Sequence, residues 1–324
     1  MEGKKAHQEM YDAGMRTGVI TILGFVFVCL LIMTGRSEHP FGNNPFDQPV
    51  AAARSGIPLV SGRTALHTGS SGSGSPAIVG QDEERYQEYL VRITNYENEG
   101  SFEILKNGRQ VCSVHEASNF GFAKVHEGKN YLLLMGTDVT GNGQPDLVIT
   151  EWSLGPRCSH TFHLFEIGDR FHHIQSIDAG SSESARFLNL DGLPGLEFIT
   201  DDWTFAYEPG GFADSPVPRV ILKYDGTSYV FAHDLMKQDP PDEDLVHATA
   251  ESIRTMGGWL TGFPPPEIGQ EMVDLIYSGN TAHALSLLDQ AWPSDVSGKD
   301  DFLLDLTTTL RKSPFYGEIL SLSR

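Results

Sequence analysis

The chain has 324 residues, a formal net charge of -20, 40% hydrophobic residues and 20% charged residues. This length fits one large domain or two smaller ones, and the composition is that of a mostly globular protein. The acidity argues against a nucleic-acid partner, because phosphate binding needs neutralising Lys and Arg. It is compatible with cation binding, although solubility alone also accounts for it.

An uncharged apolar stretch fills the 19 positions between Arg16 and Arg36. As a helix it would rise about 28 Å, enough to cross a bilayer core. Lys4 and Lys5 precede it together with Arg16, so the positive-inside tendency predicts a cytoplasmic N-terminus. We therefore expect residues 1–36 to be a cytoplasmic stub and membrane anchor, with the remainder periplasmic or extracellular. A cleaved signal peptide and a buried helix are the alternatives, and the first of these lacks a good cleavage site.

Residues 37–84 are rich in Gly, Pro and Ser, most of all in the run TGSSGSGSPAIVG. This composition predicts a flexible linker. The sequence leaves open whether Cys112 and Cys158 pair, because two cysteines make no disulfide framework, and Cys29 lies inside the apolar stretch.

Residues 85–236 alternate between apolar and polar positions, which predicts a β domain. Asn107-Gly108, Gly168-Asp169 and Asp225-Gly226 separate pairs of strands, where hairpin turns favour such residues. The expected strands are residues 89–96, 101–106, 109–115, 146–152, 160–167, 171–178, 196–203, 219–225 and 228–235.

The β domain contains an internal repeat with an offset of 51 residues. Residues 146–152 (DLVITEW) align with residues 197–203 (EFITDDW), and the preceding DVTGNGQP aligns with NLDGLPGL. Residues 89–115 form a third, more diverged unit that lacks the loop. Units of this length with several strands are typical of propeller blades.

Residues 237–324 show apolar spacings of three and four, which predict an α-helical region. Residues 272–291 resemble a single tetratricopeptide-type hairpin, although packing against the β domain is the simpler interpretation. The expected helices are residues 242–256, 266–277, 282–292 and 300–312.

The clearest chemical signal is the loop that begins at Asp138. Oxygen-bearing side chains occupy its positions 1, 3, 5 and 9, and Gly143 permits a tight turn at position 6. Hard cations such as Ca²⁺ take six to eight oxygen ligands, which alternate positions of a loop can supply. The predicted metal ligands are Asp138, Thr140, Asn142 and Asp146 by side chain and Gln144 by its carbonyl. The competing interpretation is an Asx- and Gly-rich turn that binds no metal.

DVTGNGQPDLVI, residues 138–149, resembles the calcium loop of FG-GAP and VCBS-type repeats. The resemblance implies a β-propeller-like array, mostly found on extracellular or periplasmic proteins, with Ca²⁺ as a structural cofactor. The second loop departs from the pattern, since only Asp191 and Glu197 remain of its ligand set, and we expect it to bind metal weakly or not at all. Three units are too few for a closed propeller. A diverged blade, an open array covered by the helices, and closure by homo-oligomerisation all remain open.

Two further groups of side chains are candidate sites. His163 together with His172 or His173 could chelate a transition metal across a hairpin. Carboxylates near Trp152 and Trp203 suggest a hydrolase of cell-envelope polysaccharide, and the candidates are Glu151, Asp201 and Asp202.

No nucleophile elbow, P-loop or zinc-protease motif accompanies these groups. The sequence therefore favours a membrane-anchored binding or scaffolding module without catalytic activity, whose partner is a protein or a glycan. The polysaccharide hydrolase is the alternative function.

Overall fold

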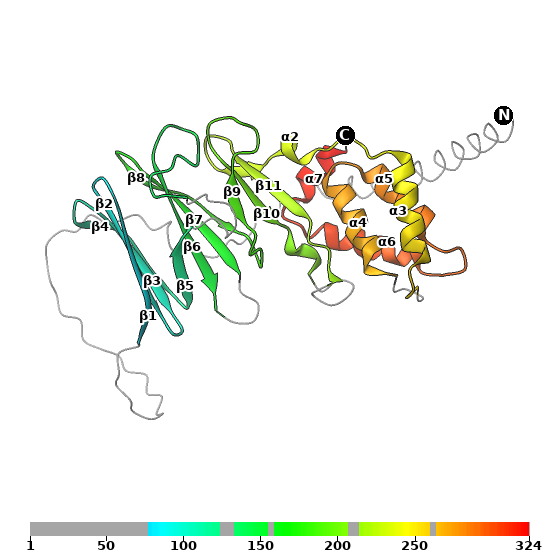
Figure 1. Ribbon diagram of the computed structural model, residues 1–324, viewed down its shortest axis with the longest axis horizontal. Helices are drawn as coiled ribbons and strands as arrows, with labels where there is room; N and C mark the ends of the chain where they lie inside the picture. The colour runs from blue at the N-terminus through cyan, green and yellow to red at the C-terminus, as the bar shows by residue number, and fades with distance from the viewer. Residues whose placement is uncertain (1–76, 124–132, 155–158, 207–213, 260–263, 324) are drawn as a thin grey trace, which may run out of the picture. The chain divides into compact units, whose positions relative to one another are not determined.

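The computed structural model describes residues 77–123, 133–154, 159–206, 214–259 and 264–323. These residues form three antiparallel four-stranded sheets, followed along the chain by helices (Figure 1). The predicted class, mainly β with an α-helical C-terminal region, is confirmed. Each sheet is a meander of consecutive strands, as expected of repeated hairpin units.

The first sheet has the order β1-β2-β3-β4. Its strands are β1 (Ile78–Tyr86), β2 (Tyr89–Tyr96), β3 (Gly100–Lys106) and β4 (Arg109–Glu116). β1 begins inside the segment whose composition indicates a linker. It is an edge strand with mostly exposed or half-buried side chains, so it lacks the apolar alternation that marks β2.

The second and third sheets repeat this arrangement with the orders β5-β6-β7-β8 and β9-β10-β11-β12. The second contains β5 (Ser118–Phe122), β6 (Asp146–Ser153), β7 (His160–Ile167) and β8 (Phe171–Asp178). The third contains β9 (Arg186–Leu188), β10 (Glu197–Asp201), β11 (Arg219–Tyr224) and β12 (Tyr229–Phe231), and a 3-10 turn, η1 (Trp203–Phe205), follows β10.

Pattern reading finds nine of these strands and misses the first strand of every sheet. β1, β5 and β9 are edge strands, and β9 has only three residues. Residues 228–235 were expected as one strand, but β12 ends at Phe231 and a helix begins at His233.

The helices are α2 (His233–Met236), α3 (Glu243–Thr255), α4 (Pro266–Tyr277), α5 (Thr281–Ala291), α6 (Lys299–Leu310) and α7 (Tyr316–Leu322). α3 to α6 lie within two residues of the expected bounds. α2 and α7 are short and were not predicted. α3 and α4 both contact α5, while α2 and α4 contact β11 and α6 contacts η1, so helices cover the third sheet.

Neighbouring sheets are joined by side-chain amides as well as by aromatic packing. The Asn95 amide donates to the Phe120 carbonyl and its oxygen accepts the Phe120 N–H, both at 2.8 Å. Gln175 makes the corresponding pair with the backbone of Tyr229, at 2.7 and 3.5 Å. The rings of Phe162 and Phe198 pack edge to face, with centroids 4.8 Å apart, between the second and third sheets.

In the described part of the chain the sheets do not close into a barrel or propeller. Arg92 of the first sheet forms ion pairs at 2.8 Å with Glu83 and 3.0 Å with Glu103, on partly exposed side chains. This face is therefore solvated and is not an apolar surface awaiting a fourth sheet. The described part of one chain is thus an open array with helices over the third sheet, and closure by homo-oligomerisation stays a prediction.

The predicted membrane anchor, residues 1–36, lies outside the described residues, as does most of the predicted linker. Among the helices that are described, none combines the length and apolar character needed to cross a bilayer.

Candidate functional site

The predicted calcium loop is closed at its base by backbone pairing. The N–H of Gly136 donates to the backbone carbonyl of Asp146 at 2.8 Å, and the N–H of Asp146 donates to the backbone carbonyl of Thr137 at 3.1 Å. Gly141 and Gly143 adopt positive φ angles of 72° and 84°, which let the chain turn back toward β6. The loop is thus a compact structure held at the start of a strand.

Asp146 is the centre of this loop. Its side chain is 1% exposed, and its Oδ2 accepts hydrogen bonds from the N–H groups of Val139 and Thr140 and from the Thr140 hydroxyl, at 2.9 to 3.0 Å. Its Oδ1 is buried and has no hydrogen-bond partner among the described residues. Burial and, to a lesser extent, the charge of Asp138 raise the pKa of Asp146, the hydrogen bonds from Thr140 and Val139 oppose the shift, and the result is a pKa of about 6.

Asp138 lies across the loop from Asp146. Its carboxylate accepts the N–H groups of Asn142 and Gly143 at 3.1 and 2.9 Å. The Thr140 hydroxyl also lies 3.4 Å from Asp138 Oδ1, so it bridges the two carboxylates. The structure therefore brings together three of the predicted ligands, Asp138, Thr140 and Asp146.

The other two predicted ligands turn toward the edge of the loop. The side-chain oxygen of Asn142 accepts the Gln144 N–H at 2.7 Å. The side chain of Gln144 packs against Gly168 in the β7–β8 turn. Asn142 would have to share or exchange its contact to bind a cation through its side-chain oxygen, whereas the predicted ligand atom of Gln144 is its backbone carbonyl oxygen, which the side-chain contact leaves unaffected.

Glu166 is a residue of this site that sequence reasoning missed. It pairs with Asp146 across β6 and β7, and its Oε2 accepts the Asn142 amide at 3.0 Å. It adds a third carboxylate beside the loop, 20 residues downstream of Asp146. Only the strand register reveals it, because no motif spans the variable connection between the two strands.

The residues fit a hard cation in chemistry, but they are not gathered as a finished coordination shell. No group of three or more His, Cys, Asp or Glu side chains positioned to hold a metal occurs in the described ranges. The observation that favours a cation is the orphaned Oδ1 of Asp146, because a buried carboxylate oxygen without a partner is costly. A bound Ca²⁺ would supply that partner and would attract the oxygens of Asp138 and Asn142.

The second repeat loop has the same outline with different chemistry. The Asn189 side-chain oxygen accepts the Gly192 N–H at 2.6 Å, and Glu197 accepts the Leu190 N–H at 2.7 Å. Asp191 forms an ion pair with Lys223 of β11. An ammonium group on the neighbouring strand thus pairs with this loop, and its weak or absent metal binding stays a prediction.

The predicted histidine pair is brought together by a shared serine. Ser176 Oγ lies 2.8 Å from His163 Nδ1 and 3.1 Å from His173 Nε2, while His163 Nε2 lies 2.9 Å from Glu151. His172 pairs in register with Glu166 instead. His163 is buried beside the rings of Phe102 and Phe120, so the described cluster joins the first and second sheets.

The three carboxylates considered for hydrolysis have separate sets of partners. Glu151 contacts His163, and Asp201 accepts the Ser182 hydroxyl at 2.7 Å. Asp202 is 4% exposed and accepts hydrogen bonds from Tyr277 and from Ser313. Each carboxylate thus has a local structural role, and nothing in their contacts pairs them as acid and base.

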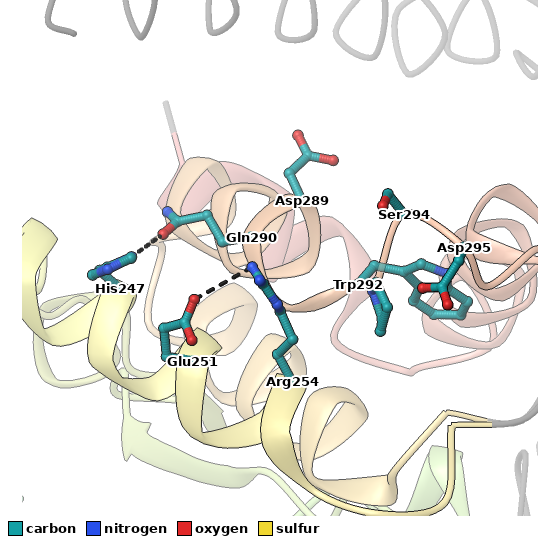
Figure 2. A pocket seen from close by; sticks show the side chains of 9 residues that line it. His247, Glu251, Arg254, Asp289, Gln290, Trp292, Ser294 and Asp295 are labelled. Atoms are coloured by element: carbon teal, nitrogen blue, oxygen red, sulfur yellow. Dashed lines mark hydrogen bonds and ion pairs between the residues drawn. The ribbon is translucent and has the colours of Figure 1, made fainter.

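A shallow polar hollow lies in the helical region. Figure 2 shows His247, Glu251 and Arg254 on α3 facing Gln290 on α5. His247 and Gln290 share a 2.9 Å hydrogen bond, and Arg254 pairs with Glu251 at 3.3 Å. Asp289, which also lines the hollow, pairs with Lys299, and none of the predicted site residues lines it.

Comparison with known proteins adds no family to these observations. No protein-family model matches the chain, and no curated protein matches it significantly.

Proposed function

We propose that this protein is a non-enzymatic binding or scaffolding module whose β-repeat array is stabilised by Ca²⁺ at the Asp138–Asp146 loop. The observation that carries the proposal is the buried Asp146 carboxylate, with one oxygen bonded three times within the loop and the other without a partner. The cation is structural in this proposal: it completes the loop and orders the start of β6.

The binding role rests on repetition without a catalytic group. Three sheets of the same meander are presented in series, and the carboxylates near Trp152 and Trp203 are engaged in structural contacts. The propeller-like character of FG-GAP and VCBS-type repeats, the anchoring by residues 1–36 and the extracytoplasmic location belong to the same proposal. Its partner would be a protein or a glycan.

The expected affinity is modest. Thr140 and Asn142 are neutral, and extracellular calcium modules with few charged ligands bind at about 0.1 to 1 mM. Calcium at ten times its Kd stabilises the folded state by about 1.4 kcal/mol. For a folded part of about 150 to 250 residues that corresponds to a rise in Tm of about 3 to 6 °C.

Thermal unfolding of the full-length chain in EDTA, Ca²⁺ and Mg²⁺ tests the proposal. We expect a Ca²⁺-selective rise in Tm that Asp138→Ala and Asp146→Asn abolish. Asp169→Asn, in the exposed β7–β8 turn, is the control and should keep the full response. An equal Tm in EDTA and 10 mM Ca²⁺ would reduce the loop to a turn that binds no metal.

A further inference from the structure

The two repeat loops share one hydrogen bond at their bases, from the backbone to the acid that opens the following strand. Val139 N–H donates to Asp146 Oδ2 at 2.9 Å, and Leu190 N–H, 51 residues later, donates to Glu197 Oε2 at 2.7 Å. Each acid is buried and opens the second strand of its sheet. A residue that balances the charge of the buried acid in one loop therefore has an equivalent position beside the other loop.

Strand register identifies that position. Asp146 pairs with Glu166 and Leu147 with Phe165. In the third sheet Phe198, the equivalent of Leu147, pairs with Leu222. The paired residues end there, and continuing the same register by one residue would bring Lys223 opposite Glu197, as Glu166 stands opposite Asp146. The same site on the second and third sheets thus carries opposite charges.

The surroundings of these two side chains follow their charges. Lys223 forms its ion pair with Asp191, whose side chain is 13% exposed, and lies 3.9 Å from Asp234. In the first loop, by contrast, no described Lys, Arg or His forms an ion pair with Asp138, Asp146 or Glu166, although His172 is the strand partner of Glu166. That loop holds three carboxylates and one unpartnered buried oxygen.

We propose that Lys223 is the resident cation of the second repeat loop, and that Glu166 completes the anionic set that makes the first loop accept a divalent cation. One residue on the neighbouring strand then decides whether a loop depends on metal. An ammonium group carries one positive charge, whereas Ca²⁺ carries two. The single charge suits the second loop, because Asn189 and Leu193 stand there in place of acidic or amide ligands. The assignment of Glu166 rests on the proposed function, whereas that of Lys223 does not.

The test exchanges the two charges. Lys223→Glu should lower the Tm in EDTA and add a second Ca²⁺ to the stoichiometry measured by titration calorimetry. Glu166→Lys should supply the first loop with its own ammonium, raise the Tm in EDTA and abolish the calcium response. Lys237→Glu, an exposed position at the end of α2, controls for the change in net charge.

The outcomes separate this inference from the proposed function. A wild-type chain that binds no Ca²⁺, beside a Lys223→Glu variant that binds one, removes the proposed function and supports the role of Lys223. A Lys223→Glu variant that loses stability without gaining a calcium ion overturns the inference, because Lys223 would then be an ordinary ion-pair partner. The double variant Lys223→Glu with Asp146→Asn should keep one site, which assigns that site to the second loop.

Discussion

The Tyr277 hydroxyl donates a 2.7 Å hydrogen bond to the carboxylate of Asp202, 75 residues earlier in the chain. Both residues are buried, one at the end of α4 and the other between β10 and η1. Burial, together with the Asp202 charge, raises the pKa of Tyr277, so its hydroxyl remains a donor. This contact fastens the helical region to the third sheet.

Substitution of Asp202 is expected to damage the fold. Asp202→Ala removes the acceptor of three groups, the Tyr277 and Ser313 hydroxyls and the Thr204 N–H. It should lower the free energy of unfolding by about 3 kcal/mol, whereas Tyr277→Phe removes one donor and should cost about 1 kcal/mol. Urea denaturation measures both. If Asp202 acted only in catalysis, the Asp202→Asn variant would instead have the same free energy of unfolding as the wild type.

Glycine positions in the calcium loop allow a matched comparison. A Cβ at Gly141 would lie 2.4 Å from the Pro194 carbonyl oxygen of the second loop, while a Cβ at Gly143 meets nothing within 4 Å. Both residues have positive φ angles. Gly143→Ala should therefore cost about 1 kcal/mol of conformational strain, and Gly141→Ala about 3 kcal/mol because the loops must also separate. Equal losses on urea denaturation would contradict the close packing of the two loops.

The sequence predicts β2, β7 and β8 with the bounds that the structure has. β2 and β7 are central strands, and β8 is an edge strand whose side chains are mostly half-buried. The first strand of each sheet, β1, β5 and β9, escapes this reasoning. β1 has the sequence IVGQDEERY. Its charged side chains discourage pairing of this open edge with another strand, and they leave no alternation of apolar and polar residues.

The candidate site is predictable only as far as it is continuous in sequence. Asp138, Thr140 and Asp146 meet as the motif indicates, because the loop brings its own residues together. Glu166 and Lys223 reach their loops through strand pairing across connections of variable length. Their opposite charges at one register position could be recognised only once the strands had been paired.

The thiol of Cys112 is expected to be unreactive in the folded protein. Cys112 pairs in register with the fully buried Ile104, and burial raises the pKa of its thiol to about 11. The thiolate population at pH 8 is then on the order of 100-fold lower than for an exposed cysteine. In a Cys29→Ser, Cys158→Ser background, iodoacetamide labelling should be slower by that factor in buffer than in urea. Rapid labelling of the native protein would show that this thiol is accessible.

The stability that Glu151 contributes to the folded protein should be lost in acid. Burial raises the pKa of Glu151, but hydrogen bonds with His163 and Ser118 outweigh it, so the pKa lies below its usual 4.5. A carboxylate with a lowered pKa contributes stability above its unfolded pKa and loses it as the pH falls through the folded value. Glu151→Gln should therefore be less stable than wild type at pH 7, and the difference should shrink as the pH falls below about 4.5.

Denaturant unfolding of both proteins across pH 3 to 7 measures this difference directly. Glu183→Gln, at an exposed position, is the control and should show no pH-dependent difference from wild type. A Glu151→Gln deficit that persists unchanged at pH 3 would mean that the residue acts through packing. In that case the His163 contact, which joins the first and second sheets through a buried ring, would not depend on the carboxylate charge.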